Sequence, residues 1–505
     1  MIFQLVIGLL LGFLLYIGIT QKDALSRAFS LDPLKNVDAR VPRVPSLWFF
    51  GCALYINPYL YIKSFTDWNR NLGDIVCFHI FGVPHVVVTD ADLAKEILVS
   101  PDLKEKQLIY YDLLKDFLGA HSLVLVGGEE WRFQRNILLH VFHLKNMQYF
   151  VNEMIDATSE FLAILSEHID NNSPNPIPGG YPTKSFDVDQ ACIALTLDVI
   201  SRTMFSKRFN IQRDTSKSKL ISEVTVGTIE LENRLFNPFR KYLWLYSSWR
   251  FEQANQFLKT QFMEIITQHR EELKNADQSK FQRDLVHLMI EATDSETGQG
   301  LSDEDIRDQC ITFFFAGNDT TARTLAWTIY MISEHPEVEQ LLIREIDSVL
   351  GSREFPDHAD IGRLEYTSMV IKEALRLFPP VPALPRVASK DTYFGPSKLF
   401  IPKGTVVGIN MDHLHKHPKY WQDPLSFNPS RFSTELPHHF SWLPFSSKER
   451  NCIGQNFALM EMKVVLCMTY KKYVFRMDRH RTIGIKTKLT QQPNDGLWLF
   501  PVRRT

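Results

Sequence analysis

FSSKERNCIG, residues 445–454, is the stretch of sequence that restricts the fold and chemistry of this chain most strongly. Its cysteine, Cys452, is a candidate ligand for haem iron, because a thiolate pushes electron density onto the metal and favours splitting of the O–O bond of bound dioxygen. A helical pattern begins directly after Gly454, and backbone N–H groups at a helix start favour an anionic sulfur. A single cysteine is more often a small buried core residue. Other segments therefore have to decide between the two interpretations.

The longest predicted helix lies about 130 residues before that cysteine. Ser302 and Asp305 have the spacing of an N-terminal capping pair, in which each side chain satisfies a backbone N–H group of the other. We expect the helix to start there, to run past Tyr330 and to end before Pro336.

The centre of this helix carries FFFAGNDTT, residues 313–321. Ala316 and Gly317 are small and leave space beside a flat cofactor, and Asp319 and Thr320 follow one turn later. Asp and Thr are mediocre helix formers, and Gly is worse than Ala by roughly 1 kcal/mol. The composition therefore favours a functional turn, and the alternative is a buried helix that tolerates a polar turn.

Two further helix segments pair residues on one face. Glu373 and Arg376 are three residues apart, which most often produces a solvated surface ion pair. Trp131 and Arg135 are four residues apart, which is also compatible with core packing beside a surface arginine. FNPSRF, residues 427–432, supplies another arginine, Arg431, shortly before the cysteine segment.

These segments, in this order, resemble the cytochrome P-450 superfamily of haem-thiolate monooxygenases. The family motifs are FxxGxRxCxG, AGxDTT, ExxR and FxPxRF, and the resemblance covers nearly the whole chain. It is closest to the membrane-bound eukaryotic branch that contains fatty-acid ω-hydroxylases and drug-metabolising enzymes. The resemblance implies a mainly α fold with small β-sheets, the cytochrome P-450 fold, preceded by an N-terminal transmembrane helix.

The resemblance also assigns roles to individual residues. Cys452 is the expected axial iron ligand, and Asp319 with Thr320 is expected to deliver protons. Eight residues are expected to contact haem b (iron protoporphyrin IX): Trp131, Arg135, Ala316, Arg386, Phe445, Arg450, Cys452 and Gly454. Three are expected to stabilise the fold near the haem: Glu373, Arg376 and Arg431.

Two positions depart from the family pattern. Lys448 stands where the haem loop normally has a glycine, and a non-glycine residue with positive φ costs roughly 1–2 kcal/mol. Ala316 stands where some ω-hydroxylases carry a glutamate that bonds covalently to haem. We therefore expect haem that is not covalently attached through residue 316.

The first twenty residues are uncharged and almost entirely apolar, which predicts a membrane-spanning helix at about 1.5 Å per residue. We expect a signal anchor over residues 1–21, a basic and proline-containing linker over 22–51 and a haem-thiolate catalytic domain over 52–505. A cleaved signal peptide is the alternative, although no basic n-region and no small-residue cleavage site are present. Basic residues follow the span, which predicts a single-pass endoplasmic reticulum protein with a cytosolic catalytic domain.

Charge and cysteine usage restrict the partners. The net charge of −2 gives no support to nucleic-acid binding. The six cysteines are scattered without a CxxC pair, which speaks against a zinc site or a disulfide framework. The chain has no GxGxxG motif of its own for a nicotinamide or flavin cofactor. The resemblance therefore implies NADPH-cytochrome P-450 reductase as electron donor, with cytochrome b5 as a second candidate. We expect four cations to form a basic patch on which the reductase docks: Arg132, Lys145, Lys448 and Lys463.

The substrate is expected to be a lipophilic small molecule, such as a fatty acid, sterol, terpenoid or xenobiotic, because the expected pocket is apolar and aromatic. Four segments should form it: residues 118–126, 313–316, 381–384 and 489–491. The aromatic residues between 235 and 249 are expected to dip into the lipid membrane. Two other functions remain open, a haem-thiolate isomerase or dehydratase of lipid peroxides and a non-catalytic haem sensor.

Overall fold

The computed structural model describes residues 32–47, 51–53, 55–57, 59–103, 109–172, 182–213, 219–236, 240, 246–275 and 283–504. The anchor predicted over residues 1–21 lies outside these ranges, as does much of the predicted linker. Within them, every helix is too short or too polar to serve as a membrane span.

Helices form most of the described chain. Those before the central long helix are α3 (Tyr61–Leu72), α4 (Ala91–Val99), α5 (Ile109–Leu118), α6 (Gly128–Val141), α7 (Leu144–Asn171), α8 (Val188–Phe205), α9 (Lys219–Phe236), α10 (Tyr246–Asn275) and α11 (Leu285–Glu291). The central helix and those after it are α12 (Asp303–Glu334), α13 (Pro336–Leu350), α14 (His358–Arg363), α15 (Glu365–Leu377), α16 (Met411–Leu414) and α17 (Gln455–Lys472).

The strands form four small sheets. They are β1 (Ile75–Ile80), β2 (Val83–Val88), β3 (Phe186–Asp187), β4 (Ala383–Val387), β5 (Thr392–Phe394), β6 (Leu399–Ile401), β7 (Val406–Asn410), β8 (Tyr473–Met477), β9 (Ile485–Thr487), β10 (Gln491–Pro493) and β11 (Trp498–Arg503). The sheet orders are β1-β2-β7-β4, β3-β11-β8, β10-β9 and β5-β6. The expectation of a mainly α fold with small β-sheets is confirmed.

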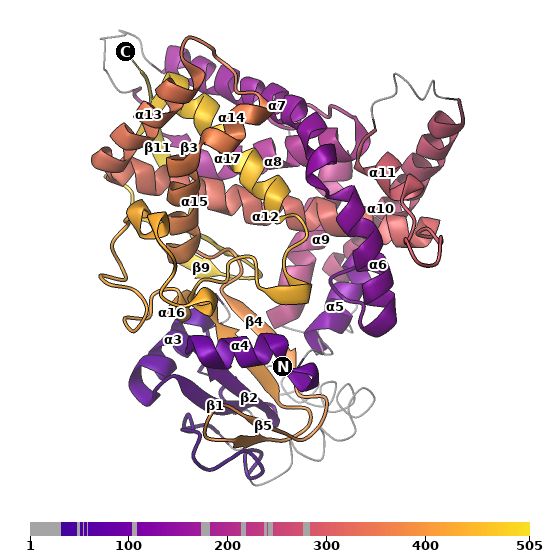
Figure 1. Cartoon of the computed structure of the whole chain (residues 1–505), viewed down its shortest axis with the longest axis vertical. Helices are drawn as coiled ribbons and strands as arrows, with labels where there is room; N and C mark the ends of the chain where they lie inside the picture. Colours follow the sequence, from indigo (N-terminus) through magenta and orange to yellow (C-terminus); the bar gives the residue numbers. More distant parts are fainter. Residues whose placement is uncertain are drawn as a thin grey trace.

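The four-stranded sheet joins segments that are far apart in the sequence. β1 and β2 form an antiparallel hairpin, with Ile75 opposite Val88. β2 then pairs in parallel with β7, which lies more than 300 residues later, and His85 is opposite Val406. In Figure 1 this sheet, with α3 and α4, lies at the lower end of the molecule, and most of the helices lie above it.

α12 crosses the middle of the helical part (Figure 1). Its N-terminus is capped reciprocally: the Ser302 side chain accepts from the backbone N–H of Asp305 at 3.1 Å, and Asp305 Oδ2 accepts from the backbone N–H of Ser302 at 3.0 Å. The helix ends at Glu334, two residues before Pro336. The start and end predicted from the sequence are both confirmed.

The main hydrophobic core surrounds α12. It includes buried residues of α7, α8, α10 and α17, among them Phe161, Leu195, Phe262 and Val465. A second core cluster lies around β2 and β7, with Val86 and Val407 fully buried. α12 and the segment before α17 are therefore both held by the main core.

Candidate cofactor site around Cys452

A closed loop precedes α17 and presents Cys452. The backbone N–H of Cys452 donates to the carbonyl of Phe445 at 2.9 Å, and that of Ser446 donates to the carbonyl of Leu443 at 2.9 Å. Two residues of the loop, Ser446 and Lys448, have left-handed φ values of 58° and 61°. The sequence-based expectation of positive φ at Lys448 is therefore confirmed.

The Cys452 side chain combines opposite influences. Burial raises the pKa of its thiol, whereas a hydrogen bond from the backbone of Gly454 and the charge of Arg135 act to lower that pKa. The side chain itself retains exposed surface. The thiol is therefore close enough to protein groups to be desolvated and is still not completely covered by them.

Gly454 lies directly before α17 and has φ −85°, which any residue adopts. A Cβ atom added there would meet no other protein atom within 4 Å. Neither the backbone conformation nor protein packing thus requires glycine at this position. A glycine here leaves room beside the sulfur for a group other than protein.

α6 binds the cysteine loop from the other side through two arginines. The guanidinium of Arg450 lies 3.9 Å from the ring centre of Trp131 in α6, and its Nη1 donates to the carbonyl of Val126 at 3.1 Å. Arg135, also in α6, donates from Nη1 and Nη2 to Asn451 O and Oδ1, at 3.0 and 2.5 Å. The predicted pair Trp131 and Arg135 is therefore buried on the face of α6 that contacts this loop.

Within the part of the chain that the structure describes, Arg135 forms no ion pair with a carboxylate. Among the described residues, both of its hydrogen bonds go to the neutral oxygens of Asn451, and burial lowers the pKa of its guanidinium while the Cys452 sulfur acts to raise it. Such an arginine suits an anionic ligand.

Arg386 is also placed in the protein interior. It lies in β4 with 3% of its surface exposed, and its Nη1 donates to the carbonyl of Pro385 at 2.9 Å. The three preceding residues of β4, Ala383 to Pro385, keep partial exposure. Its predicted contact with the cofactor stays a prediction.

The FFFAGNDTT segment forms a half-buried turn in the middle of α12. Residues 315–320 are partly exposed, although Phe313 and Phe314 before them and residues 321–329 after them are buried. Thr320 donates from Oγ1 to the carbonyl of Ala316 at 2.9 Å. Side-chain bonding to the carbonyl four residues earlier weakens and bends a helix.

Asp319 is held at both carboxylate oxygens. Thr490, in the turn between β9 and β10, donates from Oγ1 to Asp319 Oδ2 at 2.5 Å. Arg323, one turn further along α12, donates from Nε to Asp319 Oδ1 at 3.2 Å. The carboxylate is thus fixed between its own helix and a hairpin from the C-terminal part of the chain.

Arg323 connects Asp319 to a second acid. Its Nη1 donates to both carboxylate oxygens of Asp189 in α8, at 2.6 and 2.5 Å, and its Nη2 donates to Gln492 Oε1 at 3.0 Å. Burial raises the pKa of the Asp189 carboxyl, and the charge of Arg323 opposes this. No role for Arg323 or Asp189 was predicted from the sequence, and Thr490 was expected only as part of the pocket segment 489–491. The spacing of four residues between Asp319 and Arg323 on one helix was the available signal.

Glu373 and Arg376 form a fully buried ion pair rather than the solvated pair that their spacing usually indicates. Arg376 donates from Nε to Glu373 Oε2 at 2.7 Å and from Nη2 to Oε1 at 2.8 Å, and both side chains are inaccessible to solvent. Arg431 donates from Nε to Glu373 Oε1 at 3.0 Å. The remaining donors of Arg376 bind the backbone carbonyls of His415, Pro424 and Ser426.

Two predictions from the sequence need correction, that residues 313–316 line the substrate pocket and that four cations form a docking patch. Phe313 packs edge-on against Phe142, and Phe314 packs against Phe205 and Phe262. These two are core residues, because α12 is covered on those faces by α6, α8 and α10. Only Phe315 and Ala316 of the predicted pocket segment 313–316 remain partly exposed.

The predicted basic docking patch is also incomplete. Lys463 donates from Nζ to the carbonyl of Ile361 at 3.0 Å, and burial lowers its pKa, so it is not a surface cation. Arg132 is exposed but lies 2.6 Å from Glu129. The Lys145 side chain lies outside the description, and so does most of the predicted membrane-contacting segment between 235 and 249.

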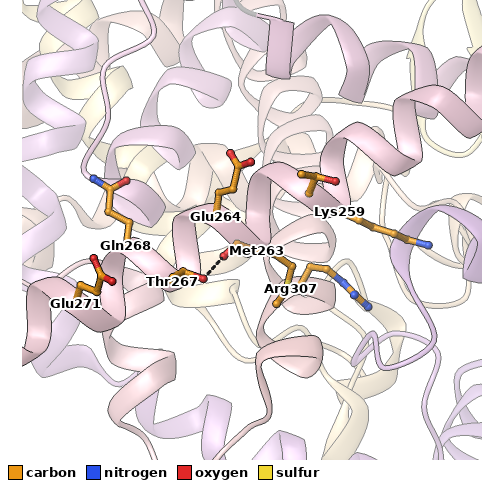
Figure 2. Close-up of a pocket in the computed structure, with 8 residues that line it drawn as sticks. Lys259, Met263, Glu264, Thr267, Gln268, Glu271 and Arg307 are labelled. Carbon is orange, nitrogen blue, oxygen red and sulfur yellow. Dashed lines mark hydrogen bonds between the residues drawn. The ribbon is translucent and has the colours of Figure 1, made fainter.

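A separate hollow of about 600 Å³ lies along α10 (Figure 2). Its lining consists of Lys259, Thr260, Met263, Glu264, Thr267, Gln268, Glu271 and Arg307. Figure 2 shows that most of the lining side chains are of polar or charged residues, and all of them except Arg307 come from α10. It contains none of the predicted site residues, so it does not belong to the cofactor site.

The residues present at the site fit haem b. Cys452 offers a sulfur on a side chain that protein does not fully cover, Gly454 leaves space beside it, and the turn of α12 is half-buried with a small residue at 316. Arg135, Arg386 and Arg450 offer buried or half-buried cations for the two propionates. These residues match a flat ring that carries two propionate groups and a metal ion with a thiolate ligand.

Comparisons with known proteins agree with this geometry. The family model described as Cytochrome P450 matches residues 42–500. Rat Cytochrome P450 4A10 is 29% identical over 469 residues, covering 91% of this chain and 89% of its own length. Human Cytochrome P450 4V2 is 30% identical over 483 residues (90% and 88%), and human Cytochrome P450 4F8 is 29% identical over 456 residues (87% and 83%).

Proposed function

Because the chain belongs to the cytochrome P450 family, we propose that it is a membrane-associated monooxygenase that inserts one oxygen atom from O₂ into a lipophilic substrate. Its monooxygenase activity and its non-covalent haem b with thiolate ligation follow from the family. The substrate class, the electron donor, the roles of single residues and the location are the parts proposed here.

The observation that carries the proposal is the position of Cys452. Its sulfur lies in a loop closed onto Phe445, beside a glycine that protein packing does not require, and in electrostatic contact with Arg135. We assign Cys452 as the iron ligand. When bound, haem with a thiolate ligand supplies the activation of dioxygen that C–H hydroxylation needs.

The chain contributes cations that bind and orient the cofactor. Arg135 and Arg450 are fixed by Asn451, Trp131 and Val126, so their positions are set before a ligand arrives. Pre-positioned charge lowers the reorganisation needed on binding. We assign Trp131, Arg135, Arg386 and Arg450 to the two propionates.

Thr320 and Asp319 are assigned to proton movement near the reacting centre. The Thr320 hydroxyl hydrogen is engaged by the carbonyl of Ala316, so the hydroxyl has to rotate before it can donate elsewhere. Asp319, the neighbouring acid, can return a proton to Thr320 only while its carboxylate is correctly oriented, and Thr490 and Arg323 hold it. A positioned proton donor of this kind contributes typically 10²–10⁴-fold to a rate.

An apolar lining supports a lipophilic substrate. Leu123 and Val126 in the loop before α6 are buried, and this loop is pinned to α12 because Leu123 N donates to Gln309 Oε1 at 3.0 Å. Phe315 is partly exposed in the α12 turn, and its ring lies edge-on to Phe117 at 5.8 Å. Burial against such side chains contributes about 25 cal/mol per Å². We propose a fatty acid as the first class to test, on the basis of the ω-hydroxylase resemblance.

The electron donor is proposed to be NADPH-cytochrome P-450 reductase, with cytochrome b5 as a second donor. The chain carries no nicotinamide or flavin motif of its own. We further propose that residues 1–21 anchor the protein in the endoplasmic reticulum membrane and that residues 52–505 form the cytosolic catalytic domain.

The experiment that tests the proposal uses the full-length protein reconstituted with reductase in lipid vesicles. The ferrous carbonyl adduct should show the red-shifted Soret band of thiolate ligation, and Cys452→Ser should remove that shift. NADPH consumption should increase with a fatty acid, sterol or terpenoid of the panel and should yield a hydroxylated product. Rearrangement of a lipid peroxide without NADPH would instead support the isomerase alternative. Haem binding with no turnover of any panel member would support the sensor alternative.

A further inference from the structure

Two histidines and an aspartate form a buried cluster that the haem chemistry does not use. His269 in α10 lies with Nε2 2.8 Å from Asp284 Oδ2, and His287 in α11 lies with Nδ1 2.8 Å from Asp284 Oδ1. All three residues are at most 3% exposed. Each residue offers one ligand atom, and the three atoms lie within 4.8 Å of one another.

The outer nitrogen of each ring is already engaged. His269 Nδ1 lies 2.8 Å from the carbonyl oxygen of Ile265, which only accepts hydrogen bonds. His287 Nε2 lies 3.2 Å from Glu272 Oε2. These partners place a proton on the outer nitrogen of each ring. In the neutral rings, the inner nitrogens therefore carry lone pairs directed toward the Asp284 carboxylate.

A ring-nitrogen lone pair and a carboxylate oxygen that lie 2.8 Å apart repel each other unless a positive charge lies near both. The backbone N–H of Asp284 approaches His287 Nδ1 only at 3.5 Å, so it neutralises little of this repulsion. A metal ion among the inner nitrogens and the carboxylate would satisfy all three groups at once. Metal-binding histidines typically donate their other ring N–H to a backbone carbonyl or a carboxylate, as His269 and His287 do here.

The aspartate is oriented by further contacts. Ser206, at the end of α8, donates from Oγ to Asp284 Oδ2 at 3.0 Å, and the backbone N–H of His287 donates to Asp284 Oδ1 at 3.0 Å. The carboxylate is thus fixed from α8 and from α11 before any ion binds. The outer partners of the two histidines, Ile265 and Glu272, both lie in α10, and that of Asp284, Ser206, lies at the end of α8.

From this arrangement we propose that His269, Asp284 and His287 bind a divalent transition-metal ion, zinc in the first instance, at a site separate from the haem. Zinc is bound by neutral imidazole nitrogen and by carboxylate oxygen. The site is closed by α8, α10 and α11, and the ligands are buried, so its role is structural. The ion ties α11 to α10 and to the end of α8.

The experiment measures zinc per haem iron in the purified holoenzyme by plasma mass spectrometry. After incubation with zinc chloride and removal of loosely bound metal with a weak chelator, about one zinc per chain should remain. His287→Gln should lose this zinc, and Glu272→Gln should weaken zinc binding by roughly 10–100-fold, as expected for an outer partner.

A second cluster in the chain provides the matched control. His121, Glu130 and Asp305 also bring their ligand atoms within 4.8 Å, but Glu130 is exposed and His121 is only half-buried. Glu130→Gln should therefore leave the retained zinc unchanged. Loss of zinc in Glu130→Gln with retention in His287→Gln would assign the metal to the surface cluster and overturn the proposal.

Two further measurements keep the proposal testable if His287→Gln does not fold. The zinc X-ray absorption spectrum of the wild-type protein should show only nitrogen and oxygen ligands, and a sulfur ligand would overturn the assignment. The thermal midpoint of the wild-type holoenzyme should fall after strong chelation and recover with zinc. A wild-type protein that retains no zinc, or whose midpoint is unaffected by chelation and zinc, would show that protons alone balance the cluster.

Discussion

Thr490 holds the carboxylate of Asp319 through a hydrogen bond of 2.5 Å between Oγ1 and Oδ2. The two residues are 171 positions apart in the sequence, and Thr490 lies in the turn of the β9–β10 hairpin. We expect this hairpin to contact the substrate. The hydrogen bond therefore joins the expected substrate-binding side of the site to the acid proposed for proton delivery.

Thr490→Val tests whether this bond orients Asp319. Valine has the same shape but donates no hydrogen bond, so Asp319 Oδ2 loses the donor that reaches it from the β9–β10 turn. The peroxide formed per NADPH consumed should increase several-fold, which is well below the roughly 10²–10⁴-fold that loss of a proton donor itself produces. The measurement is the ratio of peroxide to hydroxylated product in the reconstituted system.

Thr490→Ser is the control for that experiment, because serine keeps the hydroxyl. Its product ratio should stay close to that of the wild type. Equal coupling in the valine and serine variants would contradict an orienting role for the Thr490 hydroxyl.

The buried pair of Glu373 and Arg376 should dominate the stability of the region that precedes the cysteine loop. Arg376 uses all five of its N–H donors, two on Glu373 and three on backbone carbonyls. Arg376→Ala leaves a buried carboxylate with Arg431 as its remaining arginine, and removal of one partner of a buried pair costs about 3–5 kcal/mol. Loss of the haem Soret band should occur at a clearly lower urea concentration.

Two variants check that interpretation. Arg376→Lys should also be strongly destabilised, because an ammonium group cannot replace the planar five-donor geometry of arginine. Arg132→Ala breaks the exposed pair with Glu129 and should change stability by at most about 0.5 kcal/mol. A wild-type urea midpoint in Arg376→Lys would show that charge alone, without the fork geometry, stabilises this region.

The sequence predicted those features that depend on local patterns. Capping of α12 by Ser302 and Asp305 follows from residue types three positions apart, and the β1–β2 hairpin follows from β-branched residues around a Gly-Val-Pro turn. Positive φ at Lys448 followed from the family motif. These elements are specified by neighbours in the chain, so a single sequence is sufficient to predict them.

Features that depend on contacts between distant segments were not predictable in the same way. The Glu373–Arg376 spacing alone is typical of a surface pair, and only the carbonyls of His415, Pro424 and Ser426 around it make it a buried one. From the sequence, Lys463 was expected to be a surface cation. Its contact with the carbonyl of Ile361 arises only when α14 packs on α17, and the local sequence does not reveal that packing. The contact between Asp319 and Thr490 required the hairpin to be placed against α12.

Lys448→Gly should stabilise the cysteine loop slightly. Lys448 has φ 61°, a conformation that costs an ordinary residue roughly 1–2 kcal/mol. Glycine removes that cost but loses more conformational entropy on folding, by roughly 0.5–1 kcal/mol. The net gain should be about 1 kcal/mol or less, measured as an increase in the thermal midpoint of haem loss.

Glu449→Gly is the matched variant one position later. Glu449 is not among the residues with positive φ, so glycine there relieves no backbone strain and should lower the midpoint. The same direction of change in both variants would contradict the proposed backbone strain at Lys448.

Glu461 gives the stability of the chain a pH dependence of predictable sign. It lies in α17 with 1% of its surface exposed, and among the described residues its Oε1 has no hydrogen-bond partner. Burial raises the pKa of this carboxyl well above its usual range. In the unfolded chain the same group titrates near its ordinary pKa, so between the two values the folded state holds a proton that the unfolded state has released. Stability attributable to Glu461 therefore falls as pH rises above the unfolded pKa.

Glu461→Gln removes this dependence, and its thermal midpoint relative to the wild type should increase between pH 5 and pH 8. Glu435 is exposed, and the control variant Glu435→Gln should show no such change. If the thermal midpoints of the wild type and Glu461→Gln differ by the same amount at every pH, the buried carboxyl titrates normally in the folded protein.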